Sequence, residues 1–144
     1  MSKPIFRIVL KGVLGVLCFL GALYVGNSLA SYLKDPGLYL VLDLLNDNLI
    51  LILVMSMLFV VGEAVGSTVF PISLAAMPIN AAAAVLLLAF LFNVLELVDI
   101  LAGVAVARSL KSASSMIYAL LFIVVLLGSY FKVFKKDQPE EKTN

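Results

Sequence analysis

Glu63 is the residue whose type and position most directly suggest chemistry. It is the only acidic residue in a long apolar stretch, 49–70. Counted from Leu49 at a helical rise of 1.5 Å per residue, it lies about 21 Å along that stretch. An ionised carboxylate inside hydrocarbon costs at least about 2.5 kcal/mol on insertion scales, so this side chain should face protein or water. Glu63 could bind a proton or a cation, or it could be hydrogen-bonded across a helix interface; the sequence leaves both interpretations open.

A second polar group comes late in the next apolar stretch. Asn93, Glu96 and Asp99 recur at three-residue steps, and Arg108 and Lys111 follow them. Residues three apart lie close to one face of a helix. We interpret this outer polar cluster as a network at the membrane interface, in which two acids offset two bases. The alternative is the vestibule of a pathway, to which three further acids would add negative charge: Asp35, Asp43 and Asp47.

The two groups of acids are not expected to act as a pair. Helical rise places Glu63 about 21 Å and Glu96 about 6 Å below the same boundary, some 15 Å apart. The chain has no histidine and only one cysteine, Cys18. Histidine-based metal and haem sites and an intrachain disulfide are therefore excluded. We see no glycine-rich phosphate loop and no nucleophile with a base, so we predict no enzyme, no cofactor and no metal.

Composition indicates the environment that must hold these residues. Of the 144 residues, 63% are hydrophobic and 13% are charged, whereas soluble domains are roughly 45–50% apolar and about 25% charged. A chain this short has too small an interior to hide that much apolar surface from water. The net charge of +1 gives no electrostatic case for a nucleic acid. The expected partner is a lipid bilayer.

Four apolar stretches are each near the roughly 20 residues that a membrane-spanning helix needs. They cover about 12–33, 49–70, 80–101 and 112–131. Because they are continuous rather than alternating, they predict helices and not barrel strands. The predicted fold is an all-α membrane protein, a bundle of four transmembrane helices. It forms a single polytopic domain over 1–134, followed by a disordered cytoplasmic tail over 135–144.

The connections contain turn and surface signals. Asp35-Pro36-Gly37 predicts a turn, because Pro36 has no amide hydrogen with which to continue a helix. The segment 38–48 mixes leucines with polar residues and predicts a short amphipathic helix lying on the membrane surface. The segment 71–79, bounded by prolines, predicts either a tight turn or a shallow re-entrant segment.

The basic residues predict the orientation of the spans. With four spans, one side holds seven of them and the other holds three. The larger set is Lys3, Arg7, Lys11, Lys132, Lys135, Lys136 and Lys142; the smaller set is Lys34, Arg108 and Lys111. Basic residues accumulate on the cytoplasmic side, so both termini are predicted to be cytoplasmic. The first stretch also has features of a secretory signal with a cleavage site at 28–30, whose removal would leave three spans.

Small residues indicate where helices could pack closely. A small-residue stripe recurs at three- and four-residue steps in the first stretch: Gly15, Cys18, Ala22, Gly26 and Ala30. Gly62 and Gly66 form a similar pair beside Glu63. Such spacings let a second helix approach within a membrane. We expect a subunit or self-associating component of a membrane assembly, in a prokaryotic plasma membrane. The alternative is a small transporter or channel component that uses Glu63 to bind a proton or cation.

Overall fold

Helices make up all the regular secondary structure that the computed structural model describes, which covers residues 5–136. In chain order these are α1 (Ile5–Leu33), α2 (Pro36–Asp47), α3 (Leu49–Gly66), the 3-10 helix η1 (Ile72–Ala75), α4 (Ala76–Ala102), α5 (Val106–Lys111) and α6 (Ser114–Lys136). Four of them, α1, α3, α4 and α6, are long and apolar enough to cross a membrane. Four helices that could span a membrane therefore correspond to the four apolar stretches predicted from the sequence.

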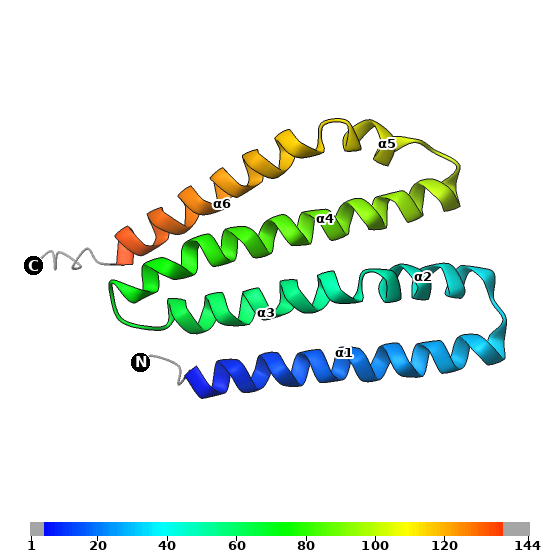
Figure 1. Ribbon diagram of the computed structural model, residues 1–144, viewed down its shortest axis with the longest axis horizontal. Helices are drawn as coiled ribbons and strands as arrows, with labels where there is room; N and C mark the ends of the chain where they lie inside the picture. Colours follow the sequence, from blue (N-terminus) through cyan, green and yellow to red (C-terminus); the bar gives the residue numbers. More distant parts are fainter. Residues whose placement is uncertain (1–4, 137–144) are drawn as a thin grey trace, which may run out of the picture.

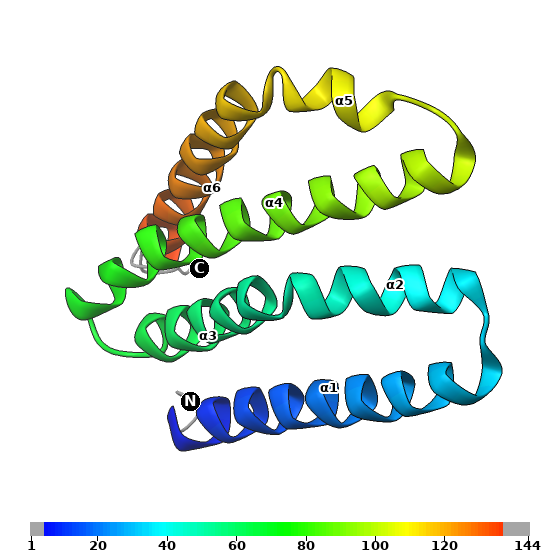
Figure 2. The same ribbon diagram turned by 45° about the vertical axis from the view of Figure 1, so that its right-hand side comes forward.

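The four long helices lie side by side in chain order, as one open row (Figure 1, Figure 2). Contacts join α1 to α3, α3 to α4, and α4 to α6. The start of α1, the connection 67–75 and the end of α6 lie together at what we call the terminal end (Figure 1). The connections 34–35 and 103–105 lie at the opposite end. A closed bundle is not confirmed, because α1 and α6 stand at the two edges of the row in both views.

The turn between α1 and α2 forms where the sequence predicts it. Asp35 precedes α2, and its carboxylate accepts hydrogen bonds from the backbone N–H groups of Gly37, at 2.8 Å, and Leu38, at 3.4 Å. Pro36 occupies the first helical position, where a missing amide hydrogen is harmless. An N-cap of this kind satisfies donors that have no partner within the helix.

The orientation predicted for the segment 38–48 is wrong. Its helix, α2, runs alongside the second half of α1 and continues the direction of α3, instead of lying across the helix ends (Figure 1). The cause is its leucine face: Leu42 is buried with Leu23 and Ala30 of α1, and Leu38 and Leu45 pack around them. An amphipathic helix buries its apolar face against whatever apolar surface is available, and here α1 supplies that surface.

The second and third spans also differ from their predicted limits. The helix α3 ends at Gly66, not at residue 70. Just after it, the hydroxyl groups of Ser67 and Thr68 donate to the carbonyls of Ala64 and Val65, at 2.7 and 2.6 Å. The short η1 follows, and α4 begins at Ala76. The segment 71–79 therefore contains a turn and the first residues of α4.

The first helix begins earlier and the last helix ends later than the spans predicted from the sequence. The helix α1 already includes Arg7 and Lys11, and α6 continues from Ser114 to Lys136. The start of the predicted tail, 135–136, is thus helical, and 137–144 lies outside the described residues.

Glycines bring neighbouring helices together near the terminal end. Gly12 of α1 faces the branched side chain of Val60 on α3, and a methyl group added at Gly12 would overlap it. Gly62 faces the amide of Asn80 on α4 in the same way, and Gly66 faces Ala76 at ordinary contact distance. Neighbouring helices are therefore tightly packed at this end, through contacts between backbone and side chains that small residues permit.

The predicted small-residue stripe on α1 divides into two parts. Gly26 faces Leu42, and Ala30 is only 1% exposed, so both contact α2. Gly15, Cys18 and Ala22 are exposed, and nothing lies within 4 Å of a Cβ placed on Gly15. The face of α1 that contacts the rest of the chain is instead marked by Ile8, Gly12 and Leu23.

Substituting Gly12 with alanine tests the contact between α1 and α3. Val60 is β-branched and has little rotameric freedom in a helix, so the added methyl must push the helices apart. We expect Gly12→Ala to lower the free energy of unfolding in mild detergent by about 1–3 kcal/mol, as overpacking does. The control is Gly21→Ala, because nothing lies within 4 Å of a Cβ placed there. Equal stability of the two variants would contradict the contact.

Candidate functional site

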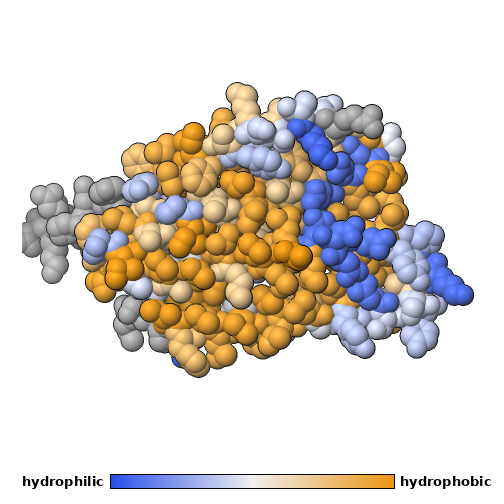
Figure 3. Space-filling view, viewed as in Figure 1, coloured by the Kyte–Doolittle hydropathy of each residue, from blue (hydrophilic) through white to orange (hydrophobic). Residues whose placement is uncertain are grey.

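A hydrophilic band crosses the row of helices near the opposite end, with apolar surface on both sides of it (Figure 3). We call the side chains that are joined across this level the polar belt: Asn27 of α1, Asn46 of α2, Asn48 between α2 and α3, Asn93 and Glu96 of α4, and Lys111 of α5. The belt is the main concentration of interacting polar side chains in the described part of the chain.

The first link of the belt joins α1 to α2. Asn27 and Asn46 bond each other reciprocally: the amide of Asn46 donates to Asn27 at 3.0 Å, and the amide of Asn27 donates to Asn46 at 3.3 Å. A reciprocal amide pair satisfies one donor and one acceptor on each side chain. It fixes the height of α2 along α1.

The second link joins the α2–α3 junction to α4. Asn48 ends α2 and begins α3. Its amide donates to the carbonyl of Leu44 at 2.8 Å, and its side-chain oxygen accepts a hydrogen bond from Asn93. One partly buried side chain thus stabilises the junction and ties it to the neighbouring span.

The third link is an ion pair at the edge of the belt. The ammonium of Lys111 lies 2.7 Å from the carboxylate of Glu96, and the two side chains are 63% and 50% exposed. Pairs this exposed contribute at most about 1 kcal/mol, so the bond orients α5 more than it stabilises the fold. The sequence analysis predicted that two acids offset two bases here, and one such pair is Glu96 with Lys111. The side chain of Arg108 lies outside the described residues.

Asp99 was predicted as part of the same cluster, but its carboxylate bonds backbone N–H groups of α5 instead. The helix α4 ends at Ala102, and Gly103 after it has a φ of 66°, in the left-handed region that glycine adopts freely. After this turn the carboxylate of Asp99 accepts hydrogen bonds from the N–H groups of Val106, at 3.1 Å, and Ala107, at 2.6 Å. Asp99 thereby caps α5, a short helix that lies between the third and fourth predicted spans.

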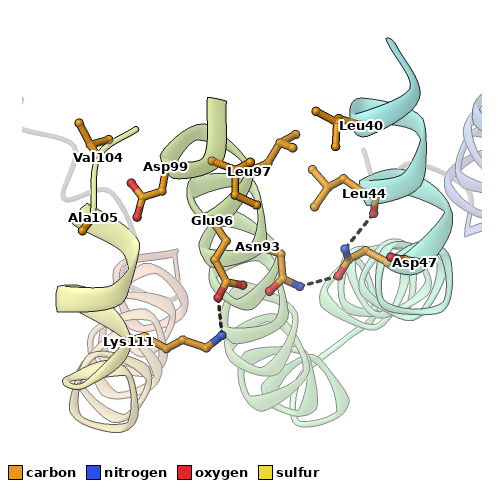
Figure 4. Close-up of a pocket in the computed structure, with 12 residues that line it drawn as sticks. Leu40, Leu44, Asp47, Asn93, Glu96, Leu97, Asp99, Val104, Ala105 and Lys111 are labelled. Atoms are coloured by element: carbon orange, nitrogen blue, oxygen red, sulfur yellow. Dashed lines mark hydrogen bonds and ion pairs between the residues drawn. The ribbon is translucent and has the colours of Figure 1, made fainter. Parts of the chain in front are cut away.

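Four residues of the belt, Asn48, Asn93, Glu96 and Lys111, line a groove between α2 and the end of α4 (Figure 4). This groove has a volume of about 680 Å³. Its polar lining is Asp47, Asn48, Asn93, Glu96, Asp99 and Lys111; its apolar lining is Leu40, Leu44, Leu97, Ile100, Val104 and Ala105. Figure 4 shows Leu40 and Leu44 on α2 facing the α4 side chains across it. Such a surface can hold an amphipathic group, but it contains no nucleophile beside a base.

Glu63 lies at the other end of the row and is not isolated. It is three residues from the end of α3 and lines a cavity of about 210 Å³ between α1 and α3. Arg7 and Lys11 of α1 line the same cavity. Their proximity to Glu63 was not predicted, because the first span was expected to begin at about residue 12, after both cations.

No polar path joins Glu63 to the belt in the described structure. Between Asn48 and Glu63 the only polar side chain of α3 is that of Ser56, and its hydroxyl donates to the carbonyl of Ile52 at 2.7 Å. Residues 81–92 of α4 are all apolar. Among the described residues, no three histidine, cysteine or acidic side chains are grouped so that they could hold a metal ion.

Some residues of the polar belt were not predicted, although the sequence contains a signal for them. Asn27, Asn46 and Asn48 interrupt leucine-rich helices, and an amide in such a setting needs a partner. The identity of each partner depends on how the helices align, which the sequence does not give.

Comparison with known proteins adds no relative. No family model matches the chain, and no curated protein or solved structure is significantly similar to it. The features that bear on function are therefore the belt, the groove and the two uncovered edges of the row.

Substituting Asp99 tests its role as the cap of α5. We expect Asp99→Ala to lower the free energy of unfolding by about 1 kcal/mol, as loss of an N-cap does. It should also increase amide hydrogen exchange at Val106 and Ala107. The matched control is Asp47→Ala, which removes a carboxylate that lines the same groove but accepts neither of these bonds. If exchange in 106–111 rises equally in both variants, the cap is not what holds α5.

Proposed function

We propose that this chain is a non-enzymatic, self-associating subunit of a membrane assembly, embedded in a prokaryotic plasma membrane with both termini in the cytoplasm. The observation that carries the proposal is the open row, which leaves a face of small residues on α1 uncovered.

The spacing of polar groups along the helices fits a bilayer. Sixteen residues separate Lys11 from Asn27 on α1, and fifteen separate Asn48 from Glu63 on α3. At 1.5 Å per residue these separations are about 24 and 22 Å. The side chains between them are largely apolar, and hydrocarbon about 30 Å thick needs an apolar slab of this order. The belt and the Glu63 cavity would then mark the two interfaces.

The proposed orientation follows from the charges at the terminal end. Arg7 and Lys11 lie at this end of the row, and positive side chains accumulate on the cytoplasmic side of membranes. The belt and its groove would then face the outer side.

The two edges of the row differ in what they offer a partner. In the window 114–131 of α6 no residue is buried, and most of its exposed side chains are large, among them Leu120, Ile123 and Phe131. Lipid chains cover such a surface well. The exposed surface of α1 also carries large side chains, such as Leu14 and Leu17. It differs in having the exposed small residues Gly15, Cys18 and Ala22 at steps of three and four residues. Helices in a membrane associate where small residues allow their backbones to approach, so α1 is the better edge for association.

A second copy of the chain is the partner that this face fits. Two copies inserted in the same orientation can place their α1 helices parallel about a two-fold axis along the membrane normal. The same three small residues then meet their own counterparts, and no further surface is required. The result would be a row of eight spans with lipid on both faces.

Transport through Glu63 is the alternative, and the geometry gives it less support. The absence of a polar path between Glu63 and the belt in the described structure, and the two cations beside Glu63, both favour a local role for this carboxylate.

Oxidative crosslinking through Cys18 tests the proposed dimer. Cys18 is exposed on the small-residue face and is the chain's only cysteine. A disulfide requires Cα atoms within about 7 Å, so copper-phenanthroline oxidation of membranes should convert most of the chain to a dimer on non-reducing gels. The control combines Cys18→Ser with Leu17→Cys, which moves the thiol about 100° around the helix to a position that is also exposed.

The control should remain monomeric. Equal crosslinking of both thiols would indicate random collision, and absence of crosslinking at Cys18 would exclude this interface. Ala22→Leu places a large side chain on the same face and should reduce the Cys18 dimer several-fold.

A further inference from the structure

We propose that the cavity between α1 and α3 at the terminal end binds the head group of an anionic phospholipid. The proposal concerns a site separate from the dimer face; it rests on the proposed membrane orientation but not on self-association. The cavity of about 210 Å³ is lined by Arg7, Ile8, Lys11 and Gly12 of α1 and by Val60 and Glu63 of α3. This volume suits a phosphate group with a small substituent.

The charges of the cavity match a single negative charge. Arg7 and Lys11 supply two positive charges and Glu63 one negative charge, which leaves +1. The ion pair found in the described residues is Lys111–Glu96 at the other end, and neither Arg7 nor Lys11 lies within ion-pair distance of Glu63. Both cations are exposed. They therefore have bonding capacity for an external anion, which a phosphodiester with one charge would neutralise.

The geometry assigns a part to each side chain. Arg7 and Lys11 are four residues apart, so they lie on one face of α1, one turn from each other. The guanidinium can bond two phosphate oxygens at once, and the ammonium supplies a compact second charge. The carboxylate of Glu63 can accept hydrogen bonds from hydroxyl groups, such as those of a glycerol head group.

The position of the cavity favours a lipid over free phosphate. Its remaining walls, Ile8 and Val60, are apolar and continue into the spanning part of α1 and α3. A phospholipid held by its phosphate could lay its acyl chains along this surface, which a free anion could not use. Basic pockets between spanning helices on the cytoplasmic side are known to hold anionic head groups.

Lipid binding to the purified full chain tests the proposal. Native mass spectrometry of the protein in mild detergent would be run with added phosphatidylglycerol, phosphatidylcholine or inorganic phosphate. We expect phosphatidylglycerol to bind at least tenfold more tightly than phosphatidylcholine, and millimolar phosphate to leave this binding unchanged. Equal affinity for the two lipids would overturn the proposal. Displacement of the lipid by phosphate would also overturn it and would indicate a site for the free anion.

Variants locate the site. Arg7→Gln with Lys11→Gln should abolish the preference for phosphatidylglycerol, whereas Lys34→Gln, which removes a cation at the opposite end of the row, should retain it. Glu63→Gln acts in the other direction: it raises the local charge to +2 and keeps a side-chain oxygen that can accept a hydrogen bond from a hydroxyl group. It should therefore strengthen binding several-fold, so the proposal stays testable if the double variant does not fold. A preference that is unchanged in the double variant, or weakened by Glu63→Gln, would contradict the assignment.

Discussion

The structure depends on side-chain hydrogen bonds that join helices at one level of the row. In a membrane the hydrophobic effect does not draw helices together, because lipid chains are as apolar as leucine side chains. Polar side chains and close packing must set their relative positions instead. The links Asn27–Asn46, Asn48–Asn93 and Glu96–Lys111 cross from α1 to α5. Each fixes the height of one element against the next.

The groove follows from the packing of α2 together with this belt. The leucine face of α2 packs on α1, the Asn27–Asn46 pair holds it at one height, and the other side of α2 faces the end of α4 across the groove. At the terminal end the helices are joined by glycine contacts at Gly12 and Gly62. Neither kind of contact links α1 to α6, so the edges of the row are available to lipid or to another copy.

What the sequence predicted well are properties that each segment has by itself. Apolar length gives the four spans, and Asp35-Pro36-Gly37 gives the turn, because capping and missing amide hydrogens act locally. What it predicted poorly depends on neighbours. The segment 38–48 has the pattern of a surface helix, yet α1 supplies an apolar face for its leucines. Glu63 looks isolated along the chain, yet α1 places Arg7 and Lys11 beside it. Three residues of the small-residue stripe, Gly15, Cys18 and Ala22, remain uncovered because the neighbouring helices pack on another face of α1.

The central claim is that the belt lies at one membrane interface and the Glu63 cavity at the other. Spin labels in reconstituted vesicles, placed on a Cys18→Ser background at Asp47 and Met57, would test it most directly. Both positions are exposed, and they lie about 15 Å apart along the helices. Oxygen, which concentrates in the bilayer centre, should collide most with the label at Met57, and a water-soluble nickel reagent should reach mainly the label at Asp47. Equal accessibility at both positions, or an oxygen maximum at Asp47, would contradict the account.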